Sequence, residues 1–197
     1  MTSTATTTSP EIIARELLYD GWYRFERLSL KMPDGKAVER HLLHNGSAAA
    51  VLPYDVERRC ILLIQQPRAA VIDAREPPLF ECIAGNLDGD TPETCIRKEA
   101  LEEAGLILGK LEPIANIWPI PPVSTERVQL YLAPYTLADR ISQGGGAEDE
   151  DEHITVAEVP FAHLQTLVAE GLLPDAKTLV AAQALMLRHP EFWSPTA

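Results

Sequence analysis

Two short, almost wholly apolar runs constrain the fold of this chain more than any other feature. They cover residues 48–54 and 60–66, and a polar turn separates them. A run of this length that is apolar at nearly every position indicates a strand buried on both faces of its sheet. Such strands need helices to cover them, so the sequence predicts an α/β fold.

The best-marked helix follows a loop at residues 86–90 that is rich in Asp and Gly. Thr91 can cap the N-terminus of this helix, and Pro92 suits its first position. Gly105 suits the left-handed residue that commonly ends a helix. We therefore expect a helix between Thr91 and Gly105.

The remaining elements fit a mixed sheet with helices on its faces. A further short apolar run, residues 79–84, leads into Gly85 and the loop before the helix. The other expected strands are 111–118, 127–134 and 154–159, and the other expected helices are 161–170 and 175–188, the last ended by Pro190.

An antiparallel β arm is expected near the N-terminus, over residues 12–44. Apolar and polar residues nearly alternate over residues 23–32, which indicates a strand. Residues 33–36 form a turn signal, and residues 37–43 fit the returning strand. An arm with so little core of its own must pack on another surface, and a partner subunit is one candidate.

Length and charge limit the classes of partner. The chain has 197 residues, enough for one well-packed domain with a short appended arm. Its formal net charge of −12 argues against nucleic acid or an anionic membrane surface as the main partner. An anionic substrate would need local neutralisation, and a bound divalent cation is the simplest means.

The cysteines and the N-terminal segment indicate a cytoplasmic protein. Cys60, Cys82 and Cys95 have no paired spacing, which indicates reduced thiols in a reducing compartment. Residues 1–10 are rich in Ser and Thr without an apolar core, so we expect a disordered tail instead of a signal peptide. No apolar run approaches the length needed to span a membrane.

Three glutamates on the expected helix are the main candidates for chemistry. Glu99, Glu102 and Glu103 are spaced three and four residues apart, so they can share one helix face. Carboxylates at such short distances repel one another. A hard cation that takes oxygen ligands makes the same arrangement favourable. Magnesium binds a few carboxylates together with waters and substrate phosphate oxygens. A solvated acidic helix face is the ordinary alternative.

This stretch resembles the Nudix box, whose pattern is G-x5-E-x7-R-E-U-x-E-E-x-G-U, with U an apolar residue. The C-terminal half of the pattern is matched at the right spacing by Glu99, Glu102, Glu103, Gly105 and Leu106.

The N-terminal half of the pattern is less regular. The loop after Gly85 is one residue short, and its acid is Asp90 instead of Glu. Lys98 replaces the Arg of the pattern, which keeps the positive charge but loses the planar fork that can grip a carboxylate. Arg97 is adjacent to Lys98 in sequence, but neighbouring residues of a helix point in different directions, so Arg97 faces elsewhere.

Residues 63–68 and 81–85 resemble the ADP-ribose and GDP-mannose pyrophosphatase branch of the Nudix family. The GDP-mannose pyrophosphatases in particular are resembled by three other segments: the short loop with Asp88 and Asp90, residues 96–100, and the three glycines at 144–146 before an acidic loop. The resemblance covers nearly the whole chain. It implies a Nudix α/β/α sandwich with a mixed sheet and an N-terminal antiparallel β arm.

The same resemblance implies a domain layout. The expected parts are a disordered tail at 1–10, a dimerising β arm at 11–45, a Nudix hydrolase domain at 46–190 and a second tail at 191–197.

The resemblance also implies a metal site. Glu99 and Glu103 would be Mg²⁺ ligands, with the backbone carbonyl of Ala84 as a further ligand and Mn²⁺ as an alternative ion. Glu102 would share the metal cluster and act in catalysis together with Glu103.

A further glutamate is implied in the acidic loop before the late strand. Glu152 falls at that position, and Glu150 is a second candidate. The expected role is metal coordination, or orienting and deprotonating the attacking water. A run of acids is otherwise typical of a solvated loop.

Three residues match family positions that contact the substrate. Arg68 ends a buried strand, and its guanidinium suits phosphate oxygens, although a surface arginine at a strand end is the plain alternative. Arg40 lies on the second strand of the expected arm and would serve the site of a partner if the arm is swapped. Glu126 follows a Pro121-Pro122 pair that replaces two glycines of the relatives and stiffens the loop.

The resemblance thus implies a Mg²⁺-dependent hydrolase of a phosphoanhydride linkage. Its substrate would be a nucleoside diphosphate sugar of the GDP-mannose or ADP-ribose type, and its products a nucleoside monophosphate and a sugar phosphate. The expected assembly is a homodimer. The alternatives are a Nudix-fold nucleotide-binding or regulatory module without turnover, and an acidic globular scaffold that binds no nucleotide.

Overall fold

The structure, a computed structural model, describes residues 9–146 and 153–194. The described chain forms two compact units. The smaller unit contains the residues up to Gly46 together with Trp118–Glu126, and the larger unit contains Ser47–Ile117 and the described residues after Glu126.

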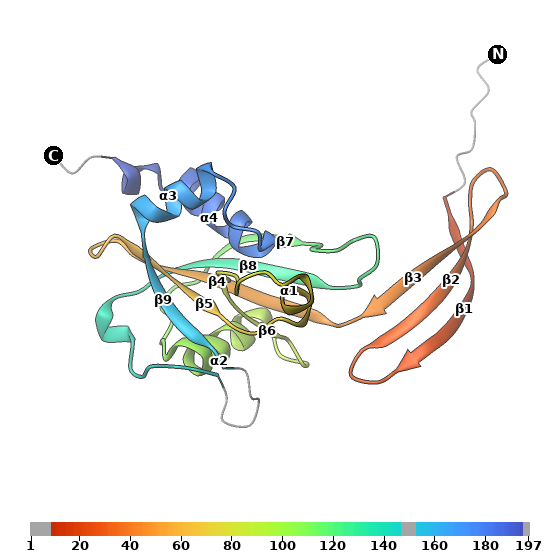
Figure 1. Ribbon diagram of the computed structural model, residues 1–197, viewed down its shortest axis with the longest axis horizontal. Helices are drawn as coiled ribbons and strands as arrows, with labels where there is room; N and C mark the ends of the chain where they lie inside the picture. Colours follow the sequence, from red (N-terminus) through yellow and green to blue (C-terminus); the bar gives the residue numbers. More distant parts are fainter. Residues whose placement is uncertain (1–8, 147–152, 195–197) are drawn as a thin grey trace, which may run out of the picture. The chain divides into compact units, whose positions relative to one another are not determined.

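The smaller unit is built on a three-stranded antiparallel sheet in the order β1-β2-β3 (Figure 1). The strands are β1 (Glu11–Asp20), β2 (Arg24–Lys31) and β3 (Ala37–His44). The turn between β2 and β3 lies where the sequence predicts it: Gly35 has φ of +82° and its N–H donates to the Met32 carbonyl at 2.9 Å.

Strand β1 lies within the expected arm, but the sequence does not mark it as a strand. The register of β1 against β2 shifts between Ile12 and Ala14 and again between Leu17 and Tyr19. Irregularities of this kind interrupt the alternation of apolar and polar residues by which a strand is recognised. Every residue of β1 is exposed, so the strand adds apolar surface and little core.

A buried ion cluster holds the three strands of the arm together. Glu26 on β2 is 1% exposed, yet it pairs with Arg15 on β1 at 2.7 Å, with Arg24 on its own strand, and with His44 on β3 at 2.9 Å. A buried carboxylate is tolerated when it is paired and hydrogen-bonded in this way.

The larger unit contains a mixed sheet in the order β7-β8-β4-β5-β9, with β6 paired to β4. Its strands are β4 (Ser47–Asp55), β5 (Cys60–Gln65), β6 (Ile83–Asn86), β7 (Glu112–Ile117), β8 (Arg127–Pro134) and β9 (Thr155–Pro160). Strand β4 runs parallel to β8 and antiparallel to β5 and β6. β4 and β5 pair at Tyr54 and Asp55, next to their connecting turn, and β6 pairs with the other half of β4.

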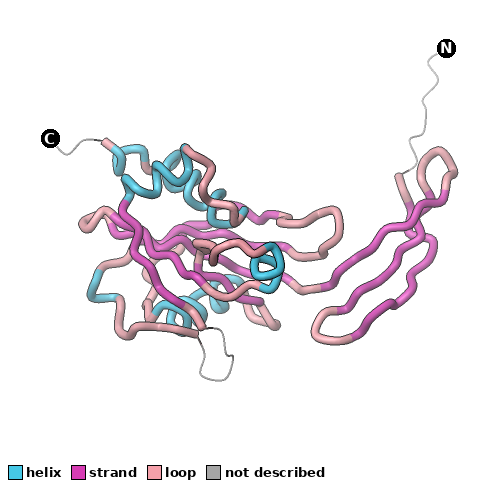
Figure 2. Tube along the Cα trace, viewed as in Figure 1, coloured by secondary structure: helices cyan, strands magenta, loops and turns pink. Residues whose placement is uncertain are grey.

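Helices cover both faces of this sheet (Figures 1 and 2). Helix α2 (Pro92–Ala104) packs on one face, where Ile96 and Ala100 share a core with Ile83 of β6. Helices α3 (Phe161–Ala169) and α4 (Ala176–Arg188) pack on the other face in a separate core. The predicted α/β/α sandwich with a mixed sheet is confirmed. The expected strands and long helices agree with these bounds within about one residue, except that the run expected at 79–84 forms a strand only from Ile83 and continues to Asn86.

Short helical segments complete the larger unit. The sequence does not predict α1 (Ala69–Ala74) or the 3-10 turn η1 (Leu137–Asp139). A second 3-10 turn, η2 (Pro190–Trp193), follows α4, and the rings of Phe192 and Trp193 stack on Phe161 at 5.8 and 5.1 Å. The packed chain thus extends to Trp193. Within residues 9–146 and 153–194, no helix is long and apolar enough to cross a membrane.

Candidate active site

Helix α2 begins and ends where its capping residues predict. The Thr91 side chain accepts a hydrogen bond from Thr94 N at 3.2 Å. Gly105 adopts φ of +63°, and its N–H donates to the Leu101 carbonyl at 3.0 Å. These caps fix the register of the helix and with it the directions of the three glutamates.

The loop before α2 forms a tight turn, although it is one residue shorter than the family pattern. Asp88 and Gly89 have φ of +45° and +98°, and Asp90 N donates to the Leu87 carbonyl at 2.7 Å. Leu87 N in turn donates to the Ser47 carbonyl at 2.9 Å, at the start of β4. The short loop therefore connects β6 directly to α2.

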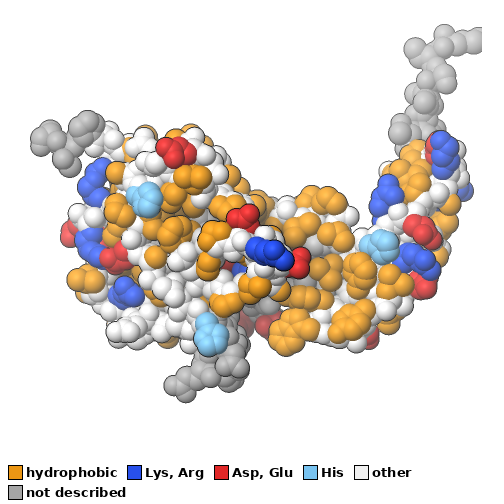
Figure 3. Space-filling view, viewed as in Figure 1, with side chains coloured by type: hydrophobic (Ala, Val, Ile, Leu, Met, Phe, Trp, Pro, Cys, Tyr) orange, Lys and Arg blue, Asp and Glu red, His pale blue; other side chains and the backbone are white. Residues whose placement is uncertain are grey.

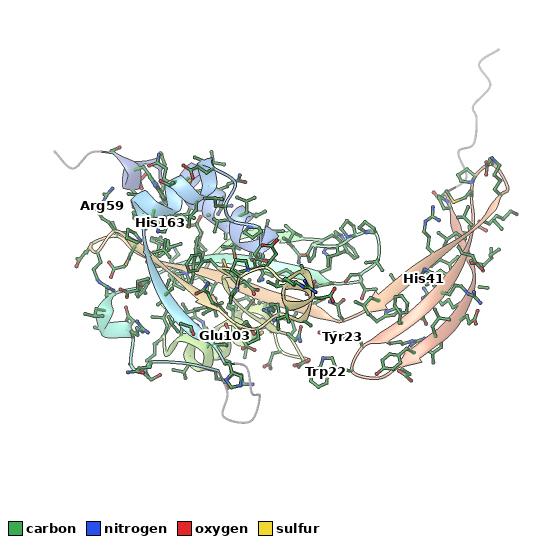
Figure 4. All side chains as sticks on the ribbon, viewed as in Figure 1. Trp22, Tyr23, His41, Arg59, Glu103 and His163 are labelled. Atoms are coloured by element: carbon green, nitrogen blue, oxygen red, sulfur yellow. The ribbon has the colours of Figure 1, made fainter. Side chains whose placement is uncertain are left out.

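Glu103 is buried between α2 and the sheet. Its side chain is labelled in Figure 4, and the residue is 1% exposed. Its Oε2 accepts a hydrogen bond from Ala84 N of β6 at 3.2 Å. The contact places a carboxylate against the backbone of the strand that leads into the box.

Glu99 lies against the next residue of the same strand. A Cβ atom built on Gly85 would lie 2.0 Å from Oε1 of Glu99 and 2.1 Å from its Cδ. The absent side chain of Gly85 thus leaves the space that the Glu99 carboxylate fills. Two consecutive residues of β6, Ala84 and Gly85, each contact one carboxylate of α2.

The donors at this point fit a hard divalent cation, because they are carboxylate oxygens beside a strand backbone. Among the residues that the structure describes, no three side chains of His, Cys, Asp or Glu are grouped so that they could hold a metal ion. The two carboxylates that lie beside β6 are those of Glu99 and Glu103. This number suits magnesium, which is usually held by one or two carboxylates, waters and substrate phosphates.

Glu102 lies on the more exposed side of the helix. It is 34% exposed and pairs with Lys98 at 3.9 Å, one turn earlier. Arg97 does not replace the arginine of the pattern, because it donates to the backbone carbonyls of Leu108 and Gly109, the latter at 2.8 Å. It anchors the segment that follows α2.

A second cluster of charges lies around Arg68, just after β5. Its Nε and Nη2 donate to the two oxygens of Glu81 at 2.9 and 3.0 Å. Glu81 is 3% exposed and also accepts from Lys177 Nζ at 2.6 Å, and Lys177 contacts Asp175 at 2.9 Å. The Arg68 side chain, 43% exposed, is held at one edge by this cluster.

The electrostatics link this cluster to the glutamates of α2. Burial alone would lower the pKa of Arg68, but the carboxylates of Glu81, Glu103 and Asp175 outweigh it and raise that pKa. Burial alone would raise the pKa of Glu81, but the two cations outweigh it and lower that pKa. Arg68 is therefore a fixed cation within electrostatic range of Glu103.

The other expected site residues lie outside the larger unit or outside the described chain. Arg40 is exposed on β3 of the smaller unit, where its Nη1 donates to the Glu39 carbonyl at 2.7 Å. Glu126 ends the second segment of that unit, and its N–H donates to Ser124 Oγ at 2.9 Å. Glu150 and Glu152 lie outside the described residues.

Three residues of the Arg68 cluster, Glu81, Lys177 and Asp175, are absent from the sequence-based site. Glu81 interrupts an apolar run, and a charge in a strand that leads into a core needs a partner, so its position was a usable signal. Lys177 gives no such signal, because its contact with Glu81 joins positions 96 residues apart.

The fold and the site together define the class of this protein. A model of the NUDIX domain matches residues 44–182, and the chain belongs to the Nudix family. The chain is 38% identical over 184 residues to the GDP-mannose pyrophosphatase of Cronobacter sakazakii (strain ATCC BAA-894). This comparison covers 90% of this chain and 95% of the relative.

Two other relatives show the same likeness. The GDP-mannose pyrophosphatase of Enterobacter sp. (strain 638) is 36% identical over 183 residues, and that of Escherichia coli O1:K1 / APEC is 32% identical over 184 residues. Each comparison covers 90% of this chain and 95% of the relative.

The fold is similar to that of a solved structure described as a crystal structure of ADP compounds hydrolase. The TM-score is 0.75 at 16% sequence identity, over 94% of this chain and 97% of that one. At this identity the likeness concerns the fold.

Proposed function

We propose that this chain is a Mg²⁺-dependent pyrophosphohydrolase that cleaves the diphosphate of a nucleoside diphosphate sugar into a nucleoside monophosphate and a sugar phosphate. The observation that carries the proposal is that Glu99 and Glu103 of α2 lie against two consecutive residues of β6. The relatives named GDP-mannose pyrophosphatase make GDP-mannose the first substrate to test. ADP-ribose is the second, on the resemblance of the segments that flank the box.

Glu99 and Glu103 would hold the magnesium ion together with the backbone carbonyl of Ala84, and Mn²⁺ would serve in its place. The bound ion would neutralise charge on the diphosphate and lower the pKa of a water. The burial of Glu103 and its hydrogen bond from Ala84 N keep the carboxylate in place before substrate arrives. Glu102 would share the cluster from the more exposed side of the helix.

The acid–base step needs a group that takes a proton from the attacking water. We assign this role to Glu152, with Glu150 as the second choice, on the family resemblance alone. Glu152 would alternatively complete the metal site. The described residues on either side of this loop belong to the larger unit, which also contains Glu99 and Glu103.

Arg68 would bind the substrate through its guanidinium. Glu81 fixes two of its nitrogens, which limits the freedom that the side chain would lose on binding. Its positive charge would offset the negative diphosphate near the acidic helix. Arg40 and Glu126 are further proposed substrate contacts.

We further propose that the chain is a homodimer that uses the arm as its interface. Figure 3 shows apolar side chains over the surface of the arm. Large exposed residues on β1 and its following turn include Ile13 at 55%, Tyr19 at 61% and Trp22 at 88%. Figure 4 shows Trp22 and Tyr23 at that turn. Burial of this surface against a second copy would remove it from water.

The cytoplasm is the proposed compartment. Cys60, Cys82 and Cys95 are buried and free, and burial raises the pKa of each thiol, to about 12 for Cys82. Such thiols are inert packing residues and fit a reducing environment.

Product analysis tests the proposed activity. GDP-mannose, ADP-ribose and UDP-glucose would each be incubated with the protein, with and without Mg²⁺. The proposal expects Mg²⁺-dependent release of a nucleoside monophosphate, fastest from GDP-mannose, and loss of this activity in Glu103→Gln. Glu57→Gln is the control, because it removes an exposed carboxylate outside the candidate site.

A nucleotide-binding module without turnover is the alternative that the short loop and Lys98 keep open. It predicts binding of the same nucleotides, detected by calorimetry, with no product in the presence of Mg²⁺. Folded protein that neither binds nor cleaves any of the three nucleotides would contradict both readings.

A further inference from the structure

The last carbonyls of α2 are capped by a segment from far along the chain. Gly145 N donates to the Glu103 carbonyl at 2.9 Å, and Gly146 N donates to the Glu102 carbonyl at 3.2 Å. A helix leaves its final carbonyl groups without partners inside the helix. Here the two carbonyls belong to glutamates of the candidate active site.

Gly144 makes the closest approach to this helix end. It has φ of +71°, and a Cβ atom on it would lie 2.2 Å from the Glu103 carbonyl oxygen and 2.6 Å from Ala104 Cα. Both are backbone atoms, so neither can rotate out of the way. Gly145 also has positive φ, at +124°, but a Cβ atom there would have nothing within 4 Å.

Adjacent contacts join the same two segments. Ile141 N donates to the Gly105 carbonyl at 2.8 Å. A Cβ atom on Gly105 would lie 2.3 Å from the Ser142 carbonyl oxygen. Gly144 N is within 3.3 Å of Ser142 Oγ, to which it donates. The backbone after η1 is therefore fitted to the end of α2 over several residues.

We propose that Gly144 is a positioning residue for the metal site. Its missing side chain lets the glycine segment seat against the backbone of Glu103, whose carboxylate is held at the other end by Ala84 N at 3.2 Å. Glu103 is thus fixed from both sides, by its own carbonyl and by its carboxylate. A displaced backbone at Glu103 carries the carboxylate away from β6 and weakens the site.

This inference rests on the proposed metal site, and its test measures metal binding without substrate. Binding of Mn²⁺ would be followed by electron paramagnetic resonance in the full chain. Gly144→Ala is expected to weaken binding by about 10-fold, the usual effect of losing a group that orients a ligand. Gly171→Ala is the matched control, because Gly171 has φ of +70° in the turn after α3 and a Cβ atom on it would have nothing within 4 Å.

Comparing Gly144→Ala with its control variant separates an effect on the position of Glu103 from an effect of backbone strain. Both variants are expected to melt below the wild type, since each forces a Cβ into the left-handed region. Equal Mn²⁺ affinity in Gly144→Ala and wild type overturns the inference. Equal weakening in both variants overturns it too, because strain alone would then account for the loss.

Hydrogen exchange in the wild type covers the case in which Gly144→Ala does not fold. Mg²⁺ is expected to slow exchange of the Gly145 and Gly146 amides severalfold and to leave the Gly171 amide, in the turn after α3, unchanged. The absence of that difference overturns the inference. Intact Mn²⁺ binding with no hydrolysis of any nucleotide would count against the proposed activity and leave the role of Gly144 standing.

Discussion

The side chains of the candidate site are held mainly by backbone and by neighbouring charges of the larger unit. Glu103 accepts from Ala84 N, Glu99 fills the space beside Gly85, and Arg68 is fixed by Glu81. Pre-positioned groups of this kind need little rearrangement when a charged substrate binds. The two positions that test this view most directly are Gly85 and Glu81.

Gly85→Ala is expected to displace the Glu99 carboxylate, because the new Cβ would lie 2.0 Å from its Oε1. The carboxylate ends a flexible side chain, so the fold should tolerate the change while the metal site does not. We expect the Mg²⁺ concentration for half-maximal activity to rise by about 10-fold. Gly109→Ala is the control, since its nearest atom is 3.7 Å away. A Mg²⁺ dependence equal to that of wild type would contradict the placement of Glu99.

Glu81→Gln is expected to lower the free energy of unfolding by about 3 kcal/mol, the lower end of the range for breaking a buried ion pair, because Arg68 is partly exposed. The change leaves two cations without their common carboxylate. Urea denaturation measures the difference, and Glu57→Gln, at an exposed position, is the control. A loss no larger than in the control would show that the cluster contributes nothing to stability.

The difference in unfolding free energy between wild type and Glu81→Gln is also expected to depend on pH. Arg68 and Lys177 hold the pKa of Glu81 below its ordinary value, against the opposing effect of burial. A lowered pKa in the folded state contributes stability above the unfolded value, about 4.3, which is lost as pH falls through the folded pKa. The stability gap between wild type and Glu81→Gln should therefore be constant near neutral pH and narrow in acid. Urea denaturation over a pH series measures it, and a gap that widens in acid would contradict this assignment.

At the scale of elements, the site depends on one strand, one tight turn and one helix. β6 occupies the half of β4 that β5 does not pair with, and the short loop leads from it directly into α2. The caps of α2 determine which helix face carries Glu99 and Glu103. The N-terminal cap of α2 lies far enough from these carboxylates to be weakened without displacing them.

Thr91→Ala removes the side chain that accepts from Thr94 N, and should lower the free energy of unfolding by about 1 kcal/mol. The glutamates lie two turns or more beyond the cap, so Mn²⁺ affinity should stay as in wild type. Thr91→Ser keeps the hydroxyl and should retain most of the stability. Thermal melts and metal titrations on the three proteins give the comparison. A fall in metal affinity with Thr91→Ala would mean that the cap also orients the site.

At the scale of the whole molecule, the proposed homodimer gives Arg40 a role in the site of the partner. Arg40 lies on β3 of the arm, and Glu103 lies in the larger unit. If the arm is exchanged between subunits, an Arg40→Ala chain and a Glu103→Gln chain can complement each other. One of the two sites in such a mixed dimer would then contain both native residues.

Co-expression of Arg40→Ala and Glu103→Gln should restore about a quarter of wild-type activity, since half of the randomly paired dimers would contain one intact site of two. Arg68→Ala with Glu103→Gln is the control: both residues belong to the larger unit of one chain, so no intact site forms. Activity assays on the purified mixtures decide the matter. A mixture with Arg40→Ala that remains as inactive as the control would exclude a role in the partner's site.

The sequence predicts the elements whose signals are local. α2 is predicted almost to the residue because Thr91, Pro92 and Gly105 are its own caps, and β4 and β5 are predicted because their burial needs no knowledge of their neighbours. β1 is missed because register shifts break its alternation. α1 is missed because its six residues, none of them buried, bear no pattern.

The residues of the candidate site likewise divide into those that local sequence patterns predict and those that only the tertiary structure brings together. Glu99 and Glu103 can be placed from helix spacing, and the contact of Glu99 with Gly85 explains why glycine is needed there. The cluster around Arg68 needs the tertiary structure, because Lys177, which shares Glu81 with Arg68, comes from α4. The glycine segment that caps α2 is recognisable in sequence as a motif, but its contact with Glu103 is not.

The hydrogen bond between Ala84 and Glu103 joins residues only 19 positions apart, whereas the one between Lys177 and Glu81 joins residues 96 apart. Closing a short segment costs less chain entropy, so the carboxylate end of the site can assemble early in folding. Arg68 and Glu81 are only 13 positions apart, but the contact of Lys177 with Glu81 has to wait until α4 has docked. Under the proposed function, an evolving lineage could thus inherit the two proposed magnesium-binding glutamates and the strand beside them as one contiguous block of chain, while drift in distant segments retunes which nucleotide sugar the enzyme accepts.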